Sequence, residues 1–239
     1  MKNMSNEIII LAGTAATIGF IHTVLGPDHY LPFIVLSKAR KWAITKTVVV
    51  TFLCGLGHIL SSIILGFVGI ALGIAVFKLE AIESSRGEIA AWFLIAFGLT
   101  YFTWGIHRAL RMRHHEHSHP HKNGEIHSHD HEHISGHSHI HTSKSGSLTP
   151  WVLFTIFVFG PCEPLIPLIM YPAAKHNMAS VMIVASIFGV TTISTMLGIV
   201  LASSYGLSKL SVSRLEKYSH ALAGLAILLC GVAIKFLGL

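Results

Sequence analysis

Six side chains that can bind a cation lie in otherwise apolar stretches of the sequence. They are His22, Asp28, His29, His58, Cys162 and Glu163. Imidazole nitrogens are suited to nickel, cobalt, copper, iron and zinc, and carboxylates compensate the charge of a divalent cation. A carboxylate in hydrocarbon is costly unless it is paired, protonated or facing a polar cavity. These residues therefore predict a pathway for a divalent transition-metal cation.

The spacing of these residues indicates how they could meet. His22 and His29 are seven residues apart, which is two turns on one face of a continuous helix. Gly26-Pro27 between them predicts a helix break, because proline removes a backbone donor and glycine loosens the helix. Gly160-Pro161 predicts a second break, directly before Cys162 and Glu163. We expect the first four residues to form the site and these last two to close it, although a lone buried histidine such as His58 is often only a packing residue.

A separate, histidine-rich segment differs in composition from the apolar stretches. Between His114 and His141, twelve of 28 residues are histidine, and no apolar periodicity is present. We expect this segment to be disordered without metal and to chelate divalent metals as an accessory site. A pH-responsive or solubilising loop is the alternative, since histidine titrates at about pH 6.5. The accessory ligands predicted there are His115, His117, His119, His121, His127, His129, His131, His133, His137, His139 and His141.

The composition indicates which class of protein positions these residues. Of 239 residues, 52% are hydrophobic and 12% charged, against about 25% charged in soluble proteins, and the mean hydropathy is +0.63. This excludes an ordinary soluble enzyme and predicts an integral membrane protein in a lipid bilayer. The net charge of +6 is scattered, so no nucleic-acid partner is expected. No nucleophile-base set or cofactor fingerprint is present, so we expect no enzyme and no required cofactor.

Six apolar stretches are long enough to cross a bilayer, which takes about 20 helical residues. They cover approximately Ile8 to Leu36, Ile44 to Phe77, Ile89 to His107, Trp151 to Ala174, Met178 to Leu207 and Tyr218 to Leu239. Of the lysines and arginines, twelve fall in connections on one side and five on the other. Because cytoplasmic loops carry the excess, we predict an inner (plasma) membrane protein with a cytoplasmic His-rich loop and both termini outside.

The two halves of the sequence resemble each other. Residues 25–31 align with 159–165 at an offset of 134, and Gly55 aligns with Gly189 at the same offset. Gly98 aligns with Gly224 at an offset of 126. A repeat of three spans must be inverted, as in many secondary transporters. We therefore predict an all-α membrane protein of six transmembrane helices in two inverted three-helix repeats, residues 1–107 and 150–239, joined by the loop 108–149.

These motifs resemble the nickel/cobalt transporter families, including the NicO-type branch and its urease-associated relatives. Their His-four residues-Asp-His signature is similar to His22-Thr-Val-Leu-Gly-Pro-Asp28-His29, which is one residue longer. Their Leu-Gly-His element is similar to Leu56-Gly57-His58, which is followed by Ser61 and Ser62. The resemblance implies that His22, Asp28, His29 and His58 recognise the metal. Some efflux members also carry a His-rich loop between two three-helix halves.

We thus expect a transporter of nickel or cobalt, with zinc, manganese or iron as other cargoes. Efflux is favoured, and import by the same fold is the alternative. A proton could be the coupling ion through Asp28 or Glu163, and the oligomeric state is left open.

A second resemblance supports a different function. Residues 160–165 are similar to the Pro-Cys segment of membrane thiol-electron carriers of the cytochrome-maturation type, which also have two inverted three-helix halves. That chemistry needs one reactive cysteine per half, and Asp28 stands where the first would be, so this alternative, using Cys162, is disfavoured. An organic-anion exporter would need an arginine or lysine within the spans, and we expect none at midplane depth.

Overall fold

The computed structural model describes residues 2–111, 115–120, 126–131, 148–208 and 216–237. The helices in these ranges are α1 (Lys2–Leu25), the 3-10 turn η1 (Pro27–His29), α2 (Leu31–Ala39), α3 (Ile44–Ala71), α4 (Val76–Arg111), α5 (Leu148–Phe159), α6 (Leu165–Ala174), α7 (Met178–Ser208) and α9 (Ser219–Leu237). The predicted helical membrane-protein class is confirmed. By length and composition, five described helices can cross a membrane, namely α1, α3, α4, α7 and α9, whereas α5 and α6 are shorter. Six spans in an inverted repeat are therefore not established by helix length.

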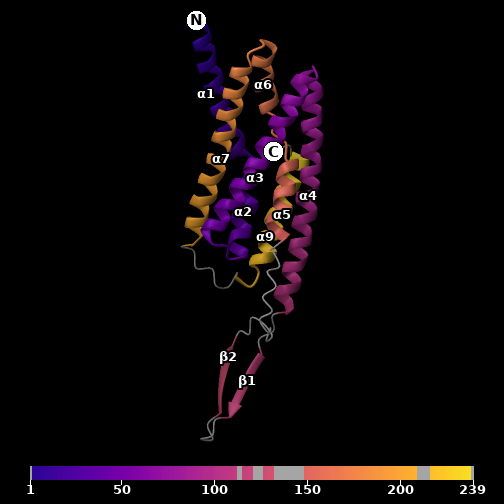
Figure 1. Cartoon of the computed structure of the whole chain (residues 1–239). Helices are drawn as coiled ribbons and strands as arrows, with labels where there is room; N and C mark the ends of the chain where they lie inside the picture. The colour runs from indigo at the N-terminus through magenta and orange to yellow at the C-terminus, as the bar shows by residue number, and fades with distance from the viewer. Residues whose placement is uncertain (1, 112–114, 121–125, 132–147, 209–215, 238–239) are drawn as a thin grey trace.

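Two short strands extend beyond the C-terminal end of α4 (Figure 1). β1 (His115–Pro120) and β2 (Ile126–His131) pair antiparallel, with His117 opposite His129. The sequence did not predict strands in this segment. Its disorder without metal and its role as a metal ligand stay predictions, and five of the histidines concerned lie outside the described residues. These five are His121, His133, His137, His139 and His141.

Both predicted break points coincide with helix ends. α1 ends at Leu25, directly before Gly26-Pro27, and the chain makes one 3-10 turn before α2 begins. α5 ends at Phe159, directly before Gly160-Pro161, and α6 begins at Leu165. Each proline removes a donor and disfavours helical geometry in the residue before it. The first and fourth predicted spans are thus each divided into two helices.

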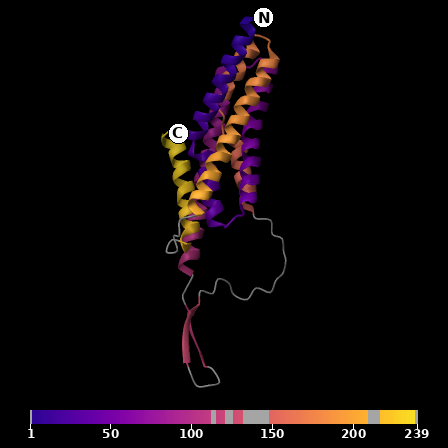
Figure 2. The ribbon, with the colours of Figure 1, turned by 90° about the vertical axis from the view of Figure 1, so that its left-hand side faces the viewer.

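The long helices pack in pairs that combine the two halves of the chain. α1 lies along α7, and α4 lies along α9 (Figures 1 and 2). α3 contacts both α5 and α7. The N-terminal end of α1 and the β1–β2 hairpin lie at opposite ends of the molecule. Which end faces the cytoplasm stays a prediction.

The contact between α4 and α9 is reciprocal. A Cβ atom at Gly98 would lie 2.4 Å from the Leu228 backbone nitrogen, and one at Gly224 would lie 2.2 Å from the Phe102 nitrogen. The offset of 126 converts the first pair of residues into the second. The same relation holds for Gly105 with Ala221 and Gly231 with Ile95. Glycine is required at these positions because the two backbones approach too closely for a side chain.

α4 differs from its predicted extent. It begins at Val76, whereas the apolar stretch begins at Ile89, and it continues to Arg111, past the predicted boundary at residue 107. Glu83 and Arg86, which the hydropathy pattern assigned to an outer loop, lie inside this helix. The five basic residues counted on the outer side therefore include Arg86, which lies within a helix and not in a connection.

Candidate functional site

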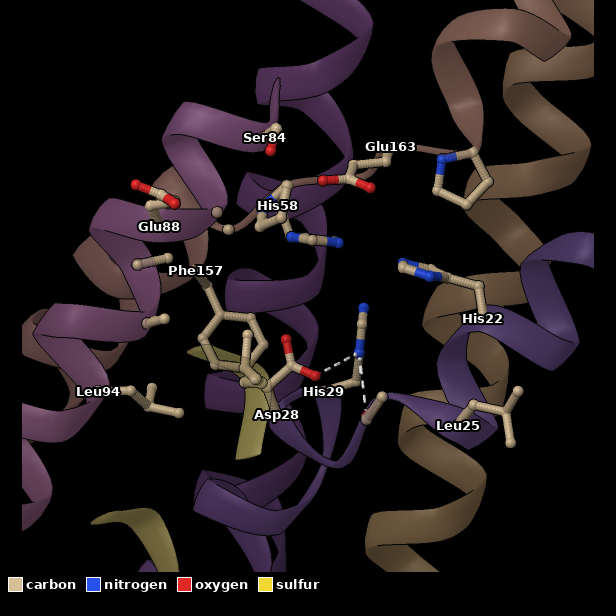
Figure 3. A pocket seen from close by; sticks show the side chains of 18 of the residues that line it. His22, Leu25, Asp28, His29, His58, Ser84, Glu88, Leu94, Phe157 and Glu163 are labelled. Carbon is tan, nitrogen blue, oxygen red and sulfur yellow. Dashed lines mark hydrogen bonds and ion pairs between the residues drawn. The ribbon is translucent and has the colours of Figure 1, made fainter. Parts of the chain in front are cut away.

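Three histidines from three elements of the first half converge on one point. His22 comes from the last turn of α1, His29 from η1, and His58 from the middle of α3. One ring nitrogen of each lies within 4.8 Å of the others. The ring centroids of His22 and His29 are 4.7 Å apart, and those of His29 and His58 are 5.1 Å apart. In Figure 3 the three rings point toward one another.

The protonation of His29 follows from its neighbours. Its Nδ1 lies 3.1 Å from the Gly26 carbonyl oxygen and 3.1 Å from Asp28 Oδ1, both of which are acceptors. Nδ1 therefore carries the hydrogen and donates it, and in the neutral imidazole Nε2 keeps a free lone pair. A histidine metal ligand usually has such an arrangement, because a carboxylate or carbonyl on one nitrogen fixes the ring with the other nitrogen toward the metal.

The Nε2 atoms of His22, His29 and His58 are buried and have no hydrogen-bond partner among the described residues. Buried polar atoms almost always have a partner, so three unpaired nitrogens in one cluster require an explanation. Divalent metal binding supplies one, since each nitrogen would become a ligand.

The two break glycines make room for these rings. A Cβ at Gly26 would lie 2.5 Å from His29 Nδ1, and one at Gly160 would lie 2.9 Å from His58 Nδ1. The backbone of Gly26 has φ −85° and ψ 97°, which other residues adopt readily. Glycine is therefore needed at this position for close approach and not for its backbone freedom.

The three histidines line a cavity of about 660 Å³ between α1, α4, α9 and the α5–α6 break. Three carboxylates, those of Asp28, Glu88 and Glu163, and the Lys235 ammonium line the same cavity. Lys235 Nζ lies 2.9 Å from Glu88 Oε1. In their ordinary ionised states these groups leave two negative charges, which would balance one divalent cation.

Cys162 is not among the residues that line this cavity. Its side chain is fully buried in an apolar cluster that includes Leu165 and Phe188. The structure thus brings together five of the six predicted site residues and separates Cys162 from them. All three cysteines of the chain, Cys54, Cys162 and Cys230, are buried and free.

A buried ion pair beside the site was missed by the sequence patterns. Arg86 is paired with Glu83, whose side chain is fully buried. Both lie in α4, a helix that can cross a membrane by length and composition, so a candidate span contains an arginine. The expectation that no arginine or lysine lies at midplane depth stays a prediction. The available signal was the Glu-x-x-Arg spacing, which places both side chains on one helix face.

The fold and the cavity define an integral membrane protein with a buried polar site formed where helices break. Compared with protein families, residues 31–233 match the family described as the cytochrome C biogenesis protein transmembrane region. The match covers most of the chain, which therefore belongs to this family. Neither the search of curated proteins nor that of solved structures found a match.

This membership corrects the proposed resemblance to nickel/cobalt transporter families, which is wrong. The residues that suggested it are few, and His22, Asp28 and His29 precede the segment that matches the family. Their extra residue of spacing already departed from the transporter signature. The family supports the alternative function, a membrane thiol-disulfide carrier, better than it supports metal transport.

Proposed function

We propose that the protein binds a divalent transition-metal cation at His22, His29 and His58 and carries it through the membrane. The observation that supports this proposal is the cluster of three buried, unpaired Nε2 atoms. Nickel, cobalt, zinc, manganese and iron are the candidate cargoes, and imidazole binds the later of these first-row metals more tightly than manganese.

The carboxylates of the cavity give the cation a way in. Asp28 holds His29 with Nε2 toward the cavity, and Glu163 lies on the opposite wall (Figure 3). A hydrated cation entering the cavity would exchange water for imidazole nitrogen while the negative charges offset its own. Asp28 or Glu163 would then be the group that exchanges a proton for the ion. Export remains the preferred direction, and import is tested by the same assay.

Transport of the cation would require two inverted halves that move relative to each other. The reciprocal glycine contacts of α4 and α9 support this arrangement, and α3 and α7 follow the same rule: Gly55 approaches Ile193, and Gly189 approaches Ile59. The offset of 134 relates these two contacts. Rocking of one half against the other about the broken helices would open the cavity to each side in turn.

Thiol-disulfide transfer is the second candidate, and family membership favours it. In this function the Cys162 thiolate attacks a disulfide of one partner and forms a mixed disulfide, releasing one partner thiolate. A thiolate of a second partner then attacks the first partner's sulfur in the mixed disulfide, breaks its bond to Cys162 and releases the Cys162 thiolate, which leaves the two partners joined by a disulfide. A second thiol of the second partner resolves that bond, so that the second partner becomes oxidised and the first partner is fully reduced. This exchange requires Cys162 to leave the apolar cluster in which it is fully buried.

Transport by protein reconstituted in liposomes separates the two functions. We would load Ni²⁺, Co²⁺, Zn²⁺ or Mn²⁺ on one side and follow its appearance on the other, and in parallel follow reduction of an enclosed disulfide by an external dithiol. His22→Ala/His29→Ala should abolish metal movement, whereas His107→Ala, which removes an exposed histidine of α4, should not. Cys162→Ser should leave metal movement close to that of the wild type.

Two results would overturn the metal proposal. One is equal movement of every metal by the wild type and by the double histidine variant. The other is disulfide reduction that Cys162→Ser abolishes, in a protein that moves no metal. The second result would establish the thiol carrier in its place.

A further inference from the structure

The α5–α6 break leaves backbone groups without helical partners. The Val158 carbonyl lies in the last turn of α5, and the Cys162 N–H lies between the two helices. Groups at such positions need partners from outside their helix when water is excluded. Both partners are side chains of α4.

Arg86 and Glu83 supply those partners. Arg86 Nη2 donates to the Val158 oxygen at 2.7 Å, and the Cys162 N–H donates to Glu83 Oε2 at 2.9 Å. Gly160 lies midway between the two anchored residues, and it is the residue that approaches His58 Nδ1. The ion pair therefore fixes both ends of the segment that packs on this ring.

The Glu83–Arg86 pair also forms hydrogen bonds with α3, one turn away from His58. Arg86 Nη2 donates to Ser61 Oγ at 2.7 Å, and Ser61 Oγ donates to the His58 carbonyl at 2.8 Å. Ser62 Oγ donates to Glu83 Oε2 at 3.2 Å. The helix that carries His58 and the break that covers it are thus tied to one point on α4.

In the first half, the carbonyl at the equivalent position receives its hydrogen bond from a different kind of donor. The offset of 134 relates Val158 to Val24, whose carbonyl accepts a hydrogen bond from Tyr30 Oη at 3.2 Å. The position equivalent to Tyr30 is Pro164, which has no side-chain donor. A donor for Val158 must therefore come from another element, and Arg86 provides it.

We propose that Glu83 and Arg86 are positioning residues that hold the α5–α6 break and α3 together so that Gly160 covers His58. Arginine suits this role because its planar guanidinium presents several donors in a fixed geometry. The proposal rests on the proposed function only for what His58 binds. The positioning itself concerns the metal-free protein.

The test measures how fast diethyl pyrocarbonate modifies individual histidines of the metal-free full chain, resolved by mass spectrometry. In Arg86→Met we expect the rate at His58 to rise about tenfold or more, as for the loss of one or more hydrogen bonds to a charged group. His22, on α1 and outside the network, should keep its wild-type rate. Arg86→Lys should fall between, because the charge remains without the fork of donors. Glu80→Gln, which neutralises an exposed carboxylate of the same helix, is the control.

Two outcomes would overturn the proposal. An unchanged rate at His58 in Arg86→Met, or in Arg86→Lys if the first variant does not fold, removes the positioning role. An equal rise at His22 and His58 shows general loosening instead. Because no metal is present, these outcomes are independent of failure in the transport assay.

Discussion

Gly26→Ala tests the geometry of the site with a single methyl group. The backbone at this position suits alanine, so the added Cβ is the main perturbation. It would lie 2.5 Å from His29 Nδ1 and 2.9 Å from Asp28 Oδ1, where ordinary contact begins at 3.4 Å. The imidazole must therefore move by nearly 1 Å, away from the two oxygens that fix it.

The expected loss follows from that displacement. Both hydrogen bonds of His29 Nδ1 are 3.1 Å long, and a shift of this size breaks or greatly weakens them. Loss of the partners that orient a metal-binding histidine typically lowers metal affinity by about 10- to 100-fold. Overpacking should also destabilise the fold by about 1–3 kcal/mol. We therefore expect Co²⁺ affinity in Gly26→Ala to fall at least tenfold.

Titration calorimetry with Co²⁺ and Ni²⁺ in detergent or nanodiscs measures this loss. Gly13→Ala is the matched control, because Gly13 lies in α1, the helix that ends directly before Gly26, and a Cβ there meets nothing within 4 Å. That variant should bind metal as the wild type does. If Gly26→Ala also binds with wild-type affinity while remaining folded, His29 is not held as we describe and does not act as an oriented ligand.

Three further changes have defined expectations. His58→Ala should lower Co²⁺ affinity by about 100-fold or more in the same titration, since one of three nitrogen ligands is lost, and wild-type affinity would exclude His58 from the site. Gly98→Val and Gly224→Val should each lower the thermal unfolding temperature of the purified protein, because each side chain meets the backbone of the facing helix, whereas Gly198→Ala should not. Deletion of residues 114–141 should reduce transport at low metal concentration and leave it intact at high concentration; complete loss at every concentration would make the His-rich segment an obligatory ligand.

The sequence predicted the features that depend on local chemistry. The Gly-Pro pairs marked both helix ends, because proline acts through its own missing donor and ring. His22 and His29 were expected to come closer through the break, and one ring nitrogen of each lies within 4.8 Å of the other. The offset of 126 between the halves identified the glycines that now pair α4 with α9.

Features that depend on tertiary contacts could not be read in this way. Glu83 and Arg86 lower the hydropathy of their window, so the span was predicted to begin at Ile89 instead of Val76. Their charges are tolerated because each neutralises the other and bonds to a broken segment far along the chain. Cys162 was assigned to the site for its position after the break, but the irregular turn directs its side chain into the apolar cluster. No local pattern reports that direction.

Family membership and the residues of the site favour different functions for this chain. The family match begins at residue 31, so the scaffold it describes includes His58 and Glu163 but not His22, Asp28 or His29. A redox carrier on this scaffold needs thiols at the breaks, whereas the first break here has a carboxylate and an imidazole, and the Sγ of the second is buried away from the cavity. Because chemistry belongs to the site and not to the fold, our proposal for what is bound rests on the imidazole cluster, while family membership supports the thiol carrier. The broken, reciprocally packed helices would then be the part that a thiol carrier and a cation carrier share.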